Sequence, residues 1–149
     1  MKIGKPKLIL NPYEWLPGYG ESKVSFRSVG ADVILDVEYE RDVPGVDGTD
    51  AVRSLRREIV FKFVRDFVRT PFPGSAFFEF DGDSSKFALG ELTEFVDSEL
   101  VRTSLEARRF VSGGGPPGVR HFSIQFLSEK IAFHILAEDV FLSDEQLVI

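Results

Sequence analysis

Residues 120–142 read RHFSIQFLSEKIAFHILAEDVFL, and this stretch decides most of the fold. Two runs of alternating apolar and polar residues flank a short polar break, which is the pattern of a β-hairpin. The break is centred on Ser128 and Glu129, so we take these as the turn. Ser-Glu is an unusual two-residue turn, and a longer or bulged turn remains open. The sequence predicts a C-terminal β-hairpin over about residues 119–142.

The alternation also predicts the register of this hairpin. With a turn at 128–129, one face holds three apolar pairs: Phe126 with Ile131, Ile124 with Phe133, and Phe122 with Ile135. The other face holds the pairs Gln125 with Ala132, Ser123 with His134, and His121 with Leu136. A register shifted by one residue would mix the two faces, so the first register is favoured. The six apolar residues are therefore predicted to be core.

In this register the two histidines of the chain share a face. His121 and His134 are diagonal neighbours, roughly 7–8 Å apart between backbones, and Glu138 is on the same face. Two imidazoles and a carboxylate can hold a divalent metal with an open position, although the sequence does not name the metal. The alternative is that both histidines line a half-wet sheet face, and few such pairs converge as a metal requires. We therefore expect no cofactor.

Bulk composition describes an ordinary folded protein. The chain has 149 residues, which corresponds to one domain spanning 1–149. Hydrophobic residues make up 43% and charged residues 28%, and 15 phenylalanines supply core material. The absence of cysteine excludes disulfides, thiolate metal sites and cysteine nucleophiles.

Charge and hydropathy restrict the partners. A net charge of -6 disfavours a nucleic-acid partner, because phosphate binding depends on Lys and Arg. No apolar stretch approaches the roughly 20 residues of a membrane span, so no membrane is expected. Residues 1–10 lack the apolar run of a signal peptide, which predicts a cytoplasmic protein. An excess of acidic residues is compatible with binding to a basic protein partner, and it also favours solubility.

Further strands precede the hairpin. Residues 23–29 and 33–39 alternate as strands, the second with one acidic face, and 42–50 reads as a loop. The segment 49–69 is ambiguous, since its apolar residues fit a helical stripe while its β-branched and aromatic residues favour a sheet. We predict a strand over about 57–68, bulged near Arg65, with a helix as the alternative.

One main helix is predicted at about residues 97–109. Asp97 or Ser98 can cap it, and an apolar stripe with arginines at its end completes the pattern. Short extended segments at about 76–80 and 86–94 precede it. The glycine- and proline-rich residues 113–118 are a connector that leads into the hairpin.

Residues 11–21 form an irregular segment rich in aromatic side chains. Tyr13, Trp15 and Tyr19 either cover one end of the core or present a surface for a partner, and we favour the first. Elsewhere, the acidic turn 81–85 lacks the spacing of a calcium loop, and the chain has no nucleophile elbow for a serine hydrolase.

Four segments resemble a group of small, mostly uncharacterised bacterial α+β proteins. They are TPFPG at 70–74, DSEL at 97–100, RHFSIQF at 120–126 and ILAEDV at 135–140. Some members of that group are thought to be immunity or antitoxin-like, so the resemblance implies a non-catalytic role. It supplies no active-site residues.

Together these observations predict an α+β fold: one domain, a mostly antiparallel, curved or sandwich-like sheet, and one main helix. The leading function is a small cytoplasmic protein that binds a protein partner without catalysis. The alternative is a metal- or small-ligand-binding protein, including a hydrolase, that uses His121, His134 and Glu138. A homodimer through an exposed sheet edge is compatible with an open sheet.

Overall fold

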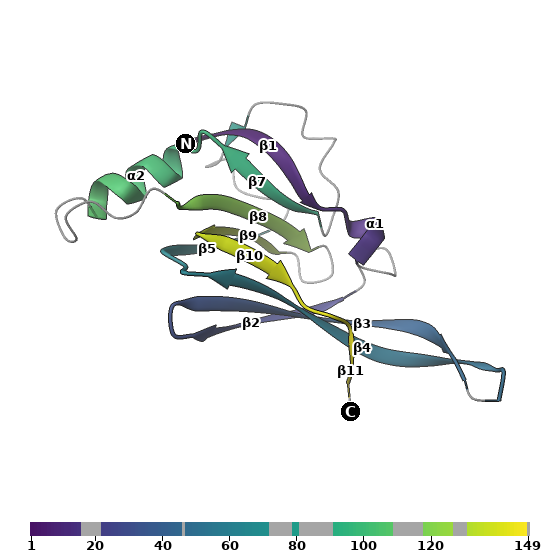
Figure 1. Ribbon diagram of the computed structural model, residues 1–149. Coiled ribbons are helices and arrows are strands. Elements are labelled where there is room, and N and C mark those ends of the chain that lie inside the picture. Colours follow the sequence, from purple (N-terminus) through teal and green to yellow (C-terminus); the bar gives the residue numbers. More distant parts are fainter. Residues whose placement is uncertain are drawn as a thin grey trace.

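The protein consists of two stacked, mostly antiparallel β-sheets (Figure 1). The computed structural model describes residues 1–15, 22–45, 47–71, 79–80, 91–108, 118–126 and 131–148. One sheet has the order β5-β9-β8-β7-β1-β6, and the other has the order β10-β4-β3-β2, with β11 also paired to β4. The strands are β1 (Lys2–Leu10), β2 (Lys23–Val29), β3 (Asp32–Pro44), β4 (Asp50–Lys62), β5 (Asp66–Pro71), β6 (Glu79–Phe80), β7 (Leu92–Val96), β8 (Arg120–Phe126), β9 (Ile131–Ala137), β10 (Asp139–Leu142) and β11 (Gln146–Leu147). The helices are α1 (Pro12–Trp15) and α2 (Glu99–Arg108).

The hairpin register is confirmed in every predicted pair. β8 and β9 are antiparallel, with Phe126 opposite Ile131 and Ser123 opposite His134. All six residues predicted to be core are buried. The turn residues 128 and 129 lie outside the described residues. The second arm is shorter than predicted, because the chain leaves this sheet after Ala137 and β10 pairs with β4 in the other sheet.

The ambiguous segment is a strand, and the helical alternative is wrong. β4 begins at Asp50, earlier than predicted, and ends at Lys62. Phe63 then adopts a positive φ of 52°, and the Val64 and Arg65 amides donate to the carbonyls of residues 31 and 136. The break near Arg65 is therefore more than a bulge, because the chain passes there from one sheet to the other as β5.

Several predicted boundaries change in the N-terminal half. β2 has the predicted bounds, but β3 continues to Pro44 and β4 begins at Asp50, so both ends of the predicted loop 42–50 are strand. β1 was not predicted, since Gly4 and Pro6 interrupt its pattern, yet it lies inside the six-stranded sheet between β7 and β6. The β1–β6 pair is parallel, and all the other strand pairs recorded in the described residues are antiparallel.

The helix prediction holds with a small shift of its bounds. α2 covers Glu99–Arg108, and the Leu100 amide donates to Ser98 Oγ at 3.2 Å, so Ser98 is the cap. The four-residue α1 lies in the segment predicted to be irregular. The described chain is thus mainly β-structure with one longer helix, and the α+β label overstates the helical part.

The remaining short predictions are partly covered. Of the predicted strand 76–80, the described residues form β6, and the predicted extension 86–94 corresponds to β7 at its C-terminal end. Residues 76–78 and 86–90 of these two segments, and residues 113–117 of the connector, lie outside the described residues. In the described part of the chain, no helix is both long and apolar enough to cross a membrane.

The core fills the space between the two sheets. Phe61 of β4 meets Phe122 of β8 with ring centroids 5.8 Å apart, which joins the two layers directly. Leu35 and Val37 of β3 are also fully buried against this cluster. Trp15 of α1 belongs to the same cluster, so α1 closes one end of it.

Candidate functional site

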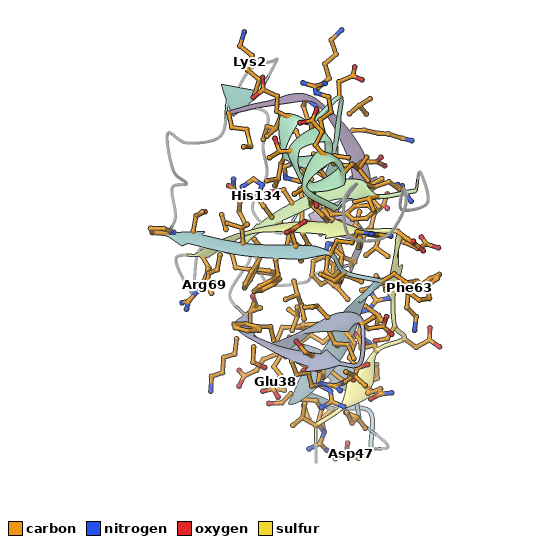
Figure 2. All side chains as sticks on the ribbon, turned by 90° about the vertical axis from the view of Figure 1, so that its left-hand side faces the viewer. Lys2, Glu38, Asp47, Phe63, Arg69 and His134 are labelled. Carbon is orange, nitrogen blue, oxygen red and sulfur yellow. The ribbon has the colours of Figure 1, made fainter. Side chains whose placement is uncertain are left out.

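The two histidines meet in the middle of the six-stranded sheet. His121 is on β8 and His134 on β9, with ring centroids 5.1 Å apart. His121 Nε2 and His134 Nδ1 are hydrogen-bonded at 2.8 Å. Phe95 of β7 packs against both rings, with centroids 5.3 Å and 6.4 Å away. In Figure 2, His134 lies in the upper half of the view, away from Phe63 at the right and Asp47 at the bottom. The sheet register therefore brings the predicted pair into direct contact.

A hydrogen-bond chain continues from this pair to α2. Ser98 Oγ lies 2.7 Å from His121 Nδ1, and the same oxygen accepts the Leu100 amide at the start of the helix. We call Ser98, His121 and His134 the relay. Ser98 was expected only as a helix cap, because its second bond connects residues 23 positions apart in sequence. No local pattern could have indicated that bond.

Two proton arrangements satisfy the relay with both rings neutral. In one, the Ser98 hydroxyl donates to His121 Nδ1, and His121 Nε2–H donates to His134. In the other, His134 Nδ1–H donates to His121, and His121 Nδ1–H donates to Ser98. Each arrangement uses one N–H per neutral imidazole. Both arrangements are neutral, so these hydrogen bonds do not by themselves decide between the two tautomers.

Burial keeps the relay neutral at physiological pH. His121 is 0% exposed and His134 is 7% exposed. Desolvation lowers the pKa of His121 to about 3, with a smaller contribution from the nearby His134, and desolvation lowers the pKa of His134 to about 4. The interpretation of a half-wet sheet face is therefore wrong, since this face is buried.

The geometry does not support a metal site at His121, His134 and Glu138. The facing nitrogens of the two rings are directed at each other and not at a common point, as a metal would require. Glu138 instead approaches Arg65, with 3.9 Å between Oε1 and the guanidinium nitrogen. Among the described residues, no group of three or more His, Asp or Glu side chains could hold a metal ion.

A hollow of about 320 Å³ lies beside the relay, between β7, the start of α2 and β8. Arg102 and Arg120 line it together with Glu94 and Asp97, and Arg120 is already paired with Glu94 at 2.7 Å. His121 contributes to the wall, yet its side chain has no exposed surface. A ligand in this hollow would therefore meet the Arg120–Glu94 ion pair and the side chains of Arg102 and Asp97, and it would not touch a reactive imidazole.

Trp15 does not belong to an exposed partner surface. Trp15 is 3% exposed and belongs to the core, which confirms the favoured interpretation for this residue and overturns its role in a partner surface. Arg57 also donates a hydrogen bond to the Trp15 carbonyl. The side chain of Tyr13 and the whole of Tyr19 lie outside the described residues.

A different surface carries exposed apolar residues, on the outer face of the five-stranded sheet. Phe141 of β10 is opposite Val60 of β4, and Val60 is opposite Ile34 of β3. We call these three residues the outer stripe. Phe141 is 50% exposed, whereas the other two are half-buried. α2 lies beside the six-stranded sheet, away from this face (Figure 1).

The sequence does contain a signal for the outer stripe. Three strands each hold three consecutive apolar residues, at 33–35, 59–61 and 140–142. Because side chains alternate between the faces of a strand, the middle residue of each triplet must point away from the core. The three middle residues are aligned across the sheet, which only the pairing of distant segments reveals.

The charges around the outer stripe are paired within the protein. Arg27 contacts Asp36 at 3.0 Å and Glu58 at 2.9 Å, on one side of the stripe. Lys62 contacts Asp32 at 2.7 Å on the other side. The stripe is therefore an apolar band between two neutralised polar bands.

Comparisons of the chain with models of known protein families, with curated proteins and with solved structures found no match. The resemblance to small bacterial α+β proteins therefore stays a prediction.

Proposed function

We propose that this protein is a small, non-catalytic cytoplasmic protein whose function is to bind a protein partner. The observation that carries the proposal is the outer stripe. A contiguous apolar patch that reaches the surface often marks an interaction site, whereas single exposed apolar residues are common and need no explanation. Phe141 and Phe63 are both exposed, and phenylalanine is enriched in interfaces.

The state of the only two histidines supports a non-catalytic role. A general base must reach a proton of its substrate. The relay is buried, both of its rings are hydrogen-bonded, and low pKa values keep them neutral. Its bonds join α2 to β8 and β9, which is a structural task.

The position of Phe63 adds to the case for a binding surface. This residue has a positive φ of 52° and a side chain that is 58% exposed. A bulky residue in this backbone region is uncommon and costs free energy, and such residues concentrate at functional sites. Phe63 directly follows β4, whose Val60 is in the outer stripe. An immunity- or antitoxin-like role, in which the partner is neutralised, agrees with such a surface.

The test replaces the largest exposed residue of the outer stripe. Immobilised wild-type protein and the Phe141→Ser variant are incubated with lysate of the source cells, and bound proteins are identified by quantitative mass spectrometry. We expect one protein to be retained by the wild type and reduced at least tenfold with the variant. Cross-linking of that complex should place the partner on β10 and β4.

Leu8→Ser is the matched control. Leu8 is 53% exposed on β1 of the other sheet, so the same loss of apolar surface occurs away from the outer stripe. Both variants are first compared with the wild type by urea unfolding, to establish that they are folded. Equal capture by Phe141→Ser and the wild type would contradict the proposal.

A further inference from the structure

β3 and β4 extend together beyond the strands on either side of them. On one side, β2 begins at Lys23, which is opposite Glu38 of β3. On the other side, the pairing of β11 with β4 ends at Leu55, and beyond it the Val148 amide donates one hydrogen bond to the Ser54 carbonyl. We call residues 40–44 and 50–53 the arm. No other strand in the described part of the chain pairs with the arm, and Figure 1 shows it projecting past the body of the protein.

The hydrogen-bonding groups at the edge of the arm can be assigned from its register. The backbone carbonyls of Ser54 and Glu58 accept hydrogen bonds from the C-terminal segment. The backbone N–H and C=O groups of the even-numbered residues of β4 therefore point away from β3. In an antiparallel pair, the backbone N–H and C=O groups of two opposite residues either point toward each other or both point away. Glu40 is opposite Ser54 and Asp42 is opposite Val52. The N–H and C=O groups of Glu40 and Asp42 therefore point to the side of β3 with which no described strand pairs there, and we call this side the open edge.

The same two residues carry the charge of this edge. The side chains of Glu40 and Asp42 are exposed, and neither forms an ion pair within the described residues. Arg41 lies between them in sequence and on the opposite face, where it contacts Glu145 at 2.5 Å. An incoming strand would thus meet two carboxylates on one face and a neutralised arginine on the other.

A second copy of the chain does not suit this edge. A two-fold pairing centred on Asp42 would place Asp42 opposite its own copy, and Glu40 opposite Pro44, which has no N–H. A pairing centred on Arg41 would place each Glu40 opposite an Asp42. Like charges directly opposite each other destabilise strand pairing. The edge therefore disfavours self-association and suits a strand of the opposite charge.

We propose that the open edge of β3 in the arm binds an extended segment of the protein partner by strand addition, and that this segment carries Lys or Arg at alternating positions. This inference rests on the proposed function and specifies the chemistry of the partner. Main-chain hydrogen bonds to Glu40 and Asp42 hold the segment, and cross-strand ion pairs select it. The side chains of Glu40 and Asp42 lie on the same face of the sheet as the outer stripe.

The probe is a fluorescein-labelled heptapeptide of alternating threonine and lysine. We expect it to bind the full chain with an affinity that falls as sodium chloride is raised, as measured by fluorescence anisotropy. A heptapeptide with glutamate in place of lysine should not bind. In the double variant Glu40→Gln/Asp42→Asn, the lysine peptide should bind at least tenfold more weakly.

The matched control removes the same two charges elsewhere, in Glu106→Gln/Asp144→Asn, where both residues are exposed. This variant should bind the lysine peptide within twofold of the wild type. Amide hydrogen exchange supplies a second measurement, in which the peptide slows exchange at Glu40 and Asp42 and leaves Val52, on the opposite edge of the arm, unchanged.

Unchanged exchange at Glu40 and Asp42 with saturating lysine peptide would overturn the inference, as would equal binding of the glutamate peptide. The proposed function is tested separately by capture of the cellular partner. A partner lost with Phe141→Ser but retained fully by the arm double variant would uphold the function and reject the role of the arm.

Discussion

At the scale of single residues, the relay shows how a buried polar group can be tolerated in a β-sandwich. A neutral imidazole has one donor and one acceptor, and burial without partners costs about 1–3 kcal/mol for each unsatisfied group. Ser98 and His134 bond to the two nitrogens of His121. The relay therefore exchanges the bonds to water for bonds between α2, β8 and β9, and it fixes where the helix begins.

Replacing Ser98 with alanine should be strongly destabilising, because this hydroxyl has two functions. It caps α2, which contributes about 1 kcal/mol, and its loss leaves His121 Nδ1 without this buried partner. We expect the free energy of unfolding in urea to fall by about 2–4 kcal/mol. Thr103→Ala, at an exposed position in the same helix, should change it by less than about 0.5 kcal/mol. Equal effects would show that the Ser98–His121 bond contributes nothing.

The relay also predicts a loss of stability in acid. The folded pKa values, about 3 for His121 and about 4 for His134, lie below the unfolded value near 6.5. Above pH 6.5 neither state binds a proton at these sites, so their effect is constant. As the pH falls below 6.5, the unfolded state takes up protons that the folded state does not, and stability decreases until the folded pKa values are reached.

This pH effect is measured by urea unfolding at pH 7.5 and pH 5.0. Each histidine should lower the stability at pH 5.0 by about 2 kcal/mol, at about 1.4 kcal/mol per pH unit. Other groups titrate over the same range, so the wild type is compared with His121→Phe/His134→Leu. The difference between the two pH values should be smaller in this variant. An identical pH dependence would mean that the histidines are not held neutral in the fold.

At the scale of single elements, β1 depends on a close approach that only glycine permits. Gly4 has a φ of +79°, and a Cβ at this position would lie 1.6 Å from the carbonyl oxygen of Val96. Gly48, in the turn at the tip of the arm, has a similar φ of +81°, but nothing lies within 4 Å of its Cβ position. The two glycines thus share a backbone conformation and differ in their surroundings.

Gly4→Ala should therefore be far more destabilising than Gly48→Ala. At Gly48 the cost is the left-handed conformation alone, about 1–2 kcal/mol. At Gly4 the methyl group must also displace the backbone of β7, so we expect a loss greater than about 3 kcal/mol. Urea unfolding of the two variants measures the difference. Similar losses would show that β1 and β7 separate easily and that crowding at Val96 is unimportant.

The sequence predicted those elements whose pattern is local. The hairpin register follows from the alternation between 120 and 137, because each apolar residue of one arm has an apolar partner in the other. The cap at Ser98 follows from the residue type at a helix start. In contrast, β1 has Gly4 and Pro6 inside it, and these residues are typical of turns.

What the sequence could not predict depends on contacts between distant segments. The chain changes sheets at Phe63 and again at Glu138, and neither crossing has a turn pattern that distinguishes it from a bulge. The candidate site has the same limitation. The sequence placed His121 and His134 on one face, but the bond to Ser98 and the burial of both rings depend on tertiary packing. Solvation, which sets their pKa values, is a property of the whole fold.

At the scale of the whole molecule, the two sheets are interleaved along the chain. The chain passes from the five-stranded sheet to the other at 63–65 and returns at Glu138, and β2 to β4 lie between segments of the six-stranded sheet in sequence. Neither sheet is built from one continuous segment of chain. Each also buries its inner face against the other, so we predict that they unfold together as a single domain.

Phe61→Ala tests this prediction of one cooperative unit. Phe61 is fully buried in the five-stranded sheet and contacts Phe122 of the other sheet, so its removal should cost about 3–5 kcal/mol. Far-UV circular dichroism in urea reports on both sheets, and fluorescence of Trp15, the single tryptophan, reports on the core beside α1. The two transitions should coincide in the wild type and shift together in the variant. Two separate transitions, or a shift seen by one probe alone, would show that the sheets unfold independently, because a local loss at Phe61 would then leave the other layer intact.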